Sequence, residues 1–213
     1  MIQIRTISRL IAAAGLLAVT SPAAIAQERS EVEPGEAYIA AEHSDWDVRC
    51  IRSGEDAIPE RCEMFQLLRD PDGNAVAVFR VNAPLNPTEG HVASAMFMTP
   101  IETFLPPGLR LRVDDGEPGA VPFAMCDASG CMARVQMDQE TVDMFQAGGD
   151  ATIQLFALVR DGSGDIGGAP VELTASLRGF TAAYDDMQAS HEILLSFIRE
   201  RQAEAAGEGE SDQ

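Results

Sequence analysis

Apolar and polar residues alternate in short runs along most of the chain, and this alternation predicts β-strands that each bury one face. In the clearest run, Leu109, Leu111 and Val113 alternate with arginines, and Pro-Gly and Asp-Gly turn residues flank it. The runs recur at spacings typical of a β-sandwich or barrel. We therefore expect strands at residues 46–50, 62–68, 76–81, 92–98, 109–113, 121–126, 131–137, 153–159 and 171–177.

A short segment after residue 137 changes to the helical period. Asp138 can cap its start, Val142, Met144 and Phe145 supply an apolar side, and Gly148 ends it. We expect one short helix inserted between strands.

A second helical segment follows residue 179, where Met187, His191, Leu194, Phe197 and Ile198 recur at steps of three and four. It either docks on the strands or is loosely tethered; the alternative is an amphipathic helix that binds a partner or a second copy. The whole pattern predicts an all-β fold. We expect a two-sheet β-sandwich of about eight or nine mostly antiparallel strands, with one short inserted helix and a C-terminal helix.

The chain divides into four regions. Residues 1–26 have the basic start, short apolar run and Ala-x-Ala motif of a cleavable secretory signal peptide. Residues 27–44 are rich in Glu and predict an acidic flexible tether, and residues 45–187 form the sandwich domain. Residues 188–213 are an amphipathic helix and a disordered acidic tail. No transmembrane segment is expected, so we predict an exported protein, periplasmic or secreted and associated with the cell surface.

All four cysteines lie after the signal segment, and an exported protein meets an oxidising compartment. Four cysteines allow three connectivities. We favour the two local disulfides, Cys50–Cys62 and Cys126–Cys131, because each closes a short loop across adjacent strands. The alternative for Cys126 and Cys131 is a redox-active pair, but thioredoxin-type pairs have two residues between them and lie at a helix start.

The charge is strongly acidic. The 15 basic residues are all arginine, against 34 acidic residues, and the net charge is −19. This balance argues against binding nucleic acid or an anionic membrane by electrostatics. A basic partner remains an alternative to simple solubility.

The sequence contains no recognised catalytic motif, and its three histidines have no metal-ligand spacing. We therefore expect no enzyme activity, no cofactor and no metal. Methionine thioethers are soft ligands for copper, so a copper site is an alternative to core packing. The methionines concerned are Met96, Met98, Met125, Met132 and Met137.

Several ordered motifs together resemble the invasion-associated locus B family of exported bacterial proteins. The resemblance covers about residues 45–187 and includes both cysteine pairs. The matching motifs are Trp46-Asp-Val-Arg-Cys50, Arg61-Cys62-Glu-Met64-Phe-Gln66, Leu105-Pro-Pro-Gly-Leu-Arg-Leu-Arg-Val-Asp114, Pro122-Phe-Ala-Met-Cys126-Asp-Ala-Ser-Gly-Cys131 and Gly179-Phe-Thr-Ala-Ala-Tyr184.

The resemblance implies a periplasmic or surface-associated all-β protein from a family named for a role in host-cell invasion, with no catalytic residues to carry over. Two functions of different class follow. The first is a non-enzymatic interaction protein that binds an unknown protein partner, with association through the C-terminal helix as one route. The second is a periplasmic thiol-disulfide or copper-handling protein that uses Cys126 and Cys131 or the methionine-rich strands.

Overall fold

The computed structural model describes residues 29–86, 88 and 90–210, and within them the chain forms eleven strands, two α-helices and one short 3-10 helix. The predicted signal peptide lies outside the described residues. The elements in chain order are η1 (Arg29–Glu31), β1 (Ala37–His43), β2 (Trp46–Ile51), β3 (Arg61–Arg69), β4 (Ala75–Asn82), β5 (Ala93–Thr99), β6 (Leu109–Val113), β7 (Gly119–Val121), β8 (Phe123–Asp127), β9 (Gly130–Met137), α1 (Gln139–Ala147), β10 (Asp150–Arg160), β11 (Ile166–Ser176) and α2 (Phe180–Glu210).

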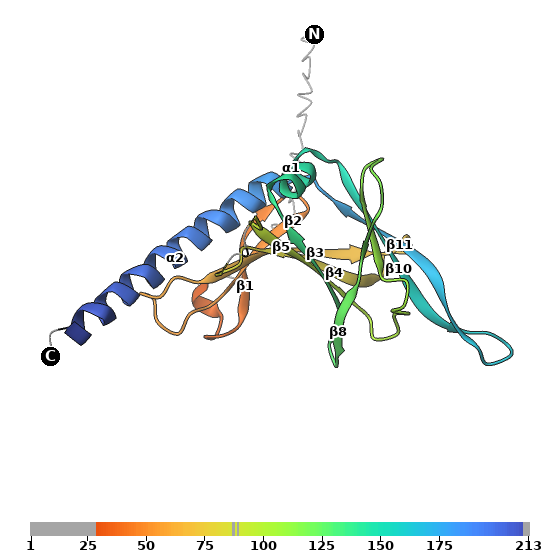
Figure 1. The fold of residues 1–213 in the computed structure, drawn as a ribbon, viewed down its shortest axis with the longest axis horizontal. Coiled ribbons are helices and arrows are strands. Elements are labelled where there is room, and N and C mark those ends of the chain that lie inside the picture. Colours follow the sequence, from red (N-terminus) through yellow and green to blue (C-terminus); the bar gives the residue numbers. More distant parts are fainter. Residues whose placement is uncertain (1–28, 87, 89, 211–213) are drawn as a thin grey trace, which may run out of the picture.

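The strands form two antiparallel sheets (Figure 1). The larger has seven strands in the order β1-β2-β3-β4-β5-β9-β8, and the smaller has four in the order β11-β10-β6-β7. Apolar side chains of both sheets share one core. The predicted all-β sandwich with an inserted helix and a C-terminal helix is confirmed.

One predicted strand, at residues 121–126, is two strands in the structure. Proline lacks the N–H that a continuous sheet ladder needs, and Pro122 separates β7 from β8. The chain changes sheets at this residue, because β7 pairs with β6 and β8 pairs with β9.

The predicted flexible tether at residues 27–44 is wrong over β1, which pairs antiparallel with β2 along the edge of the larger sheet. Its glutamates suggested a solvated segment, but Tyr38 and Ala41 pack against the core. Charged residues are expected on an edge strand, since they discourage pairing with another chain. The sandwich therefore begins before residue 45.

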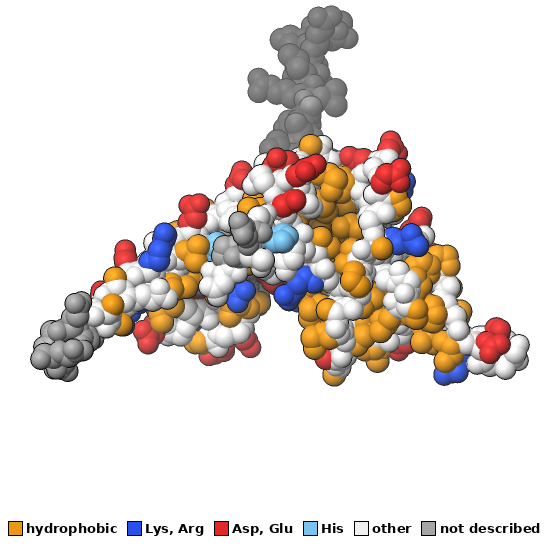
Figure 2. Space-filling model, in the orientation of Figure 1, with side chains coloured by type: hydrophobic (Ala, Val, Ile, Leu, Met, Phe, Trp, Pro, Cys, Tyr) orange, Lys and Arg blue, Asp and Glu red, His pale blue; other side chains and the backbone are white. Residues whose placement is uncertain are grey.

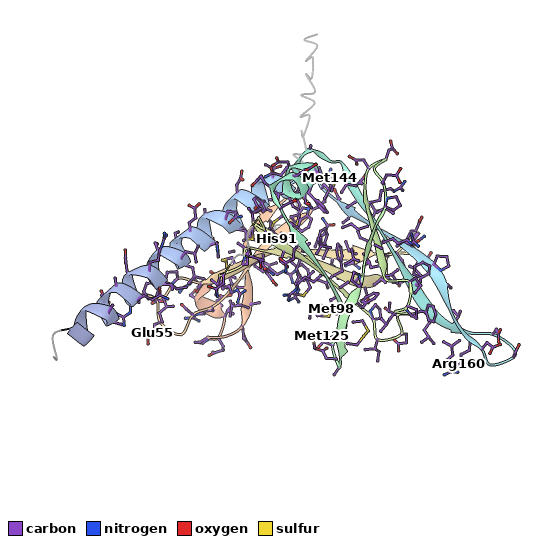
Figure 3. The ribbon with its side chains drawn as sticks, in the orientation of Figure 1. Glu55, His91, Met98, Met125, Met144 and Arg160 are labelled. Atoms are coloured by element: carbon purple, nitrogen blue, oxygen red, sulfur yellow. A yellow bond between two sulfur atoms is a disulfide. The ribbon has the colours of Figure 1, made fainter. Side chains whose placement is uncertain are left out.

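The inserted helix α1 has the predicted ends. The Asp138 side chain accepts a hydrogen bond from the backbone N–H of Thr141, at 2.8 Å, and Gly148 follows the last turn. Val142 and Phe145 are buried, whereas Met144 points outward (Figure 3).

Helix α2 begins at Phe180, as the helical period of the sequence predicts, which places its first turns inside the expected sandwich domain. It ends later than predicted, since it continues through most of the acidic tail to Glu210. Its first turns are buried through Phe180, Ala183, Tyr184 and Met187. They pack against β1, β2 and β3, the part of the larger sheet next to its β1 edge. The C-terminal half projects beyond the sheets (Figure 1).

Trp46 is fully buried in this core. Its ring meets Phe79 of β4 and Phe180 of α2 edge-on, with centroids 5.1 and 5.3 Å away. Its Nε1 donates a hydrogen bond to the carbonyl oxygen of Ser176, at 2.9 Å. One side chain thus joins both sheets and the long helix.

Candidate binding surface

The four cysteines form two disulfides, Cys50–Cys62 and Cys126–Cys131, which are the local pairs that the sequence favours. In each pair the residues lie directly opposite each other on adjacent strands. Neither pair lies at the start of α1 or α2, where a helix N-terminus would stabilise a thiolate. Both disulfides join neighbouring strands of the larger sheet.

The three histidines lie in different places. His43 of β1 has its Nε2 3.0 Å from Asp186 Oδ2 of α2, His91 precedes β5, and His191 lies on α2. Among the described residues, no group of three or more His, Cys, Asp or Glu could hold a metal ion. Within the described residues, the three histidines therefore do not share a site.

The larger sheet has an outer face, which we define as the side chains of β2, β3, β4, β5, β8 and β9 that point away from the core. In one row across it, Asp47, Phe65, Arg80, Met96 and Arg134 lie opposite one another on successive strands. The row alternates charged, aromatic and thioether side chains. It is a mixed surface and not a simple polar one.

A second row of the outer face is more polar. Arg49 lies opposite Glu63, and on the following strands Asn82 lies opposite Ser94 and Ser94 opposite Gln136. Amide, hydroxyl and guanidinium groups dominate this row, so it offers many hydrogen-bond donors.

The third row contains methionines. Met98 lies opposite Met132, and Met132 lies opposite Met125. Leu67 and Val78 continue the row on β3 and β4. Figure 3 shows Met98 and Met125 near each other, below the sheet in this view. Met137, the fifth methionine of the copper hypothesis, is fully buried in the core.

Two arginines stack on one aromatic ring of the outer face. The guanidinium carbon of Arg49 lies 3.3 Å from the ring centre of Phe65, and that of Arg80 lies 5.8 Å from it. Arg49 is also held by Asp47, at 2.8 Å, and Arg80 by Glu63, at 3.3 Å. Cation–π and ionic contacts therefore fix the directions of both guanidinium groups.

Burial raises the pKa of Glu63, although the nearby Arg80, Arg49 and Arg61 act to lower it. The charged carboxylate is thus disfavoured at this position, despite its cationic neighbours.

The outer face contains a hollow of about 540 Å³, which we call the arginine hollow. Ser94 is only 5% exposed, and its Oγ has no hydrogen-bond partner among the described residues. The Nε of Arg80 is likewise buried without a partner there. The hollow is lined by Ile51, Arg61, Cys62, Glu63, Arg80, Asn82, Pro84, Leu85, Asn86, Ser94, Met96, Arg134 and Gln136.

A second hollow, of about 730 Å³, lies on the smaller sheet. Two arginines, Arg110 and Arg112, line it together with three acidic residues, Asp115, Glu117 and Glu172, so it has no excess of positive charge. Sequence patterns locate the arginines of both hollows only as polar positions in strands. The register across the four strands β3, β4, β5 and β9, which brings Arg61, Arg80 and Arg134 to one hollow, has no signal in the sequence.

Acidic side chains are scattered along α2 and the upper edge of the molecule, while apolar side chains gather over β8, β10 and β11 (Figure 2). The exposed apolar residues of this region include Met125, Leu158, Val159 and Ile166. No helix within the described part of the chain is long and apolar enough to cross a membrane.

Comparisons with known proteins identify the fold and, separately, the family. A crystal structure of invasion associated protein b from Bartonella henselae has the same fold, with a TM-score of 0.55 and 20% sequence identity over 71% of this chain and 97% of that chain. No curated protein matches the sequence. The model of the invasion associated locus B (IalB) protein family matches residues 46–188. Since this match spans more than half of the chain, from Trp46 into α2, the chain belongs to the invasion associated locus B family.

Proposed function

We propose that this protein is an exported, non-enzymatic interaction protein that binds a protein partner through the outer face of its seven-stranded sheet. The supporting observation is the composition of that face. Protein interfaces are enriched in Arg, Met and aromatic residues and depleted in Lys, Asp and Glu. The outer face carries the arginines, methionines and aromatic residue of such an interface, with Asp47 and Glu63 as acidic residues among them, and α2 packs on the opposite face of the sheet. The residues that match are Arg49, Arg61, Arg80, Arg134, Phe65, Met96, Met98, Met125 and Met132.

The charge of the outer face contrasts with that of the chain, whose net charge is −19. A cluster of arginines on so acidic a molecule favours a partner that presents acidic groups, since complementary charge speeds and orients association. The two disulfides suit an oxidising compartment outside the cytoplasm. A role in the bacterial envelope or in host invasion follows from the family name and is part of the proposal.

A cross-linking pull-down from the exported fraction of the native organism tests this function. The variant R61E/R134E reverses two charges on the outer face, and R110E/R112E makes the same change in net charge on the other sheet. We expect R61E/R134E to recover at most one tenth of the partner that the native protein recovers. R110E/R112E should recover as much partner as the native protein. Equal recovery by both variants would contradict the proposal, as would measured turnover of a substrate.

Copper handling is the second candidate function, and the placement of three methionines favours it. Met98, Met132 and Met125 occupy adjacent positions on three neighbouring strands, on the outer face and not in the core. Met125 is 54% exposed. Thioethers select Cu(I), and three of them on one row provide the ligands of a trigonal site.

A Cu(I) titration against a chromogenic chelator distinguishes this function from simple packing. The native protein is expected to withdraw one Cu(I) per chain from the chelator, and M98L/M132L to withdraw none, because leucine keeps the volume but removes the sulfur. M144L is the control, since Met144 is exposed on α1, away from the row. Failure of the native protein to compete with the chelator would eliminate this candidate.

A further inference from the structure

We infer that the arginine hollow is a binding site for a carboxylate group, carried by a small ligand or by an acidic peptide segment. This inference rests on the proposed function for the surface it uses, and it adds the chemistry of the group that is recognised.

The lining of the hollow is an array of hydrogen-bond donors. Arg80 and Arg134 lie on either side of Met96, each directly opposite it on the neighbouring strand. Contacts with Glu63 and the Phe65 ring hold the guanidinium of Arg80 toward β3, so Arg134 is the arginine that can turn into the hollow above the methionine. In the next row Ser94 lies between Asn82 and Gln136 in the same way. A ligand rich in acceptors therefore fits the hollow.

Two donors of this array have no acceptor. The Oγ of Ser94 and the Nε of Arg80 are buried and lack hydrogen-bond partners among the described residues. Buried polar groups in folded proteins are nearly always paired, and an unpaired one requires an explanation. Ser94 is one of the residues that line the hollow. An oxygen atom of a bound ligand would satisfy these donors.

The positive charge of the hollow is only partly compensated. Arg80 contacts Glu63, whereas Arg134 forms no ion pair with any described residue. Arg61 adds a third guanidinium to the lining. One acidic side chain against three arginines leaves an excess of positive charge in the hollow. Neither Arg61 nor Arg134 forms an ion pair with a described residue, so both guanidinium groups are available to a ligand.

A carboxylate fits these groups better than a polyphosphate or a nucleic acid. Arginine binds carboxylates and phosphates alike through two parallel hydrogen bonds, so the charge of the ligand decides between them. The net charge of −19 repels highly charged polyanions at a distance but admits a group with one or two charges. The apolar residues Ile51, Leu85 and Met96 beside the donors suit the carbon skeleton that carries the carboxylate.

Binding of defined probes to the mature protein tests this inference. The probes are tetraglutamate peptide, glutarate and inorganic phosphate, and the measurement is NMR titration of backbone amides with Kd values from the shifts. We expect glutarate or tetraglutamate to shift amides of β4, β5 and β9. We also expect R134Q and S94A each to weaken that binding at least tenfold, while R112Q on the other sheet leaves the Kd unchanged.

The probes also identify the source of the carboxylate. Tighter binding of tetraglutamate than of glutarate would indicate an acidic peptide, and the reverse a small molecule; either result supports the inference. Tighter binding of phosphate than of both carboxylates would overturn it, as would no binding, or binding that R134Q and S94A leave unchanged.

The two proposals fail separately. If the carboxylates do not bind but the pull-down still depends on Arg61 and Arg134, the inference is wrong and the proposed function stands. If the carboxylates bind but no partner is recovered, the proposed function fails.

Discussion

Gly179 lies between β11 and α2, against the backbone of His43 in β1. Its φ is +91°, a conformation that glycine adopts without steric cost. A Cβ at this position would overlap the backbone carbonyl of His43. The entry of α2 into the core therefore depends on a residue without a side chain.

We expect Gly179→Ala to lower the free energy of unfolding by more than a positive φ alone explains. Gly73→Ala is the matched control, because Gly73 has a φ of +86° but no atom within 4 Å of the position that a Cβ would take. The left-handed conformation costs roughly 1–2 kcal/mol for an L-residue. Urea unfolding should give a loss in that range for Gly73→Ala and a larger one for Gly179→Ala. Equal losses would show that the approach to His43 is not tight.

The raised pKa of Tyr38 in β1 predicts that the folded protein loses stability at alkaline pH. Burial, followed by the hydrogen bond that its hydroxyl donates to Glu60, raises the pKa of Tyr38 from 10.0 to about 12. The neutral phenol is thus favoured in the folded state. Its contribution to the free energy of unfolding is therefore complete below pH 10 and is lost as the pH rises toward 12.

Urea unfolding of the native protein and Tyr38→Phe at several pH values checks this. The difference in stability between the two proteins should be constant up to about pH 10 and should shrink between about pH 10 and 12. A difference that stays constant across this window would show that the pKa of Tyr38 is not raised.

At the scale of elements, the two halves of α2 make different contributions. Phe180 and Met187 are fully buried, but Ile193 is 60% exposed and the helix from Arg199 onward contacts little of the sheets. Helix stability in proteins comes mainly from packing of an apolar face. The first turns therefore hold the fold together, and the later turns are available for association.

Two variants separate these contributions. Phe180→Ala is expected to lower the free energy of unfolding by about 3–5 kcal/mol, the range for removing a buried aromatic side chain.

Deletion of residues 199–213 should leave the denaturation midpoint nearly unchanged. Size-exclusion chromatography of the same deletion shows whether the exposed half associates: a fall in apparent mass larger than the mass of the deleted residues would locate self-association there. A large loss of stability on deletion would contradict this division of α2.

The two disulfides should contribute different amounts to the free energy of unfolding, because they close loops of different length. The cysteines are 12 residues apart in Cys50–Cys62 and 5 apart in Cys126–Cys131. On the chain-entropy model, these loops contribute about 3 and about 2 kcal/mol. Chemical denaturation of the two double Cys→Ala variants should rank them in this order. The reverse order would show that native packing around each pair, and not loop length, sets its contribution.

At the scale of the whole molecule, Trp46 couples the two sheets and α2. Because its ring contacts Phe79 and Phe180 and its Nε1 bonds to Ser176, its fluorescence reports on all three. We expect thermal transitions followed by tryptophan fluorescence and by far-ultraviolet circular dichroism to coincide, as in two-state unfolding. A fluorescence transition at lower temperature would show that α2 leaves the core before the sheets unfold.

How far the sequence predicts the fold differs from segment to segment. The alternation of apolar and polar residues locates most strands, because a strand that buries one face must have apolar side chains at every second position. It does not locate β1, which follows a glutamate-rich stretch that is also compatible with a tether, or the change of sheet at Pro122. In both places the partner strand decides the structure, and the local sequence cannot name that partner.

The sequence by itself determined the sandwich, the local cysteine pairing and the family, because these depend on periodicity, on short loops and on motifs that are contiguous in the chain. Only the tertiary structure decided which side chains share the outer face. Arg61, Arg80 and Arg134 come from three strands, and the register of the sheet alone brings them to one hollow. A shift of one residue in that register would reverse the faces of a strand, and no local pattern records the register between distant strands.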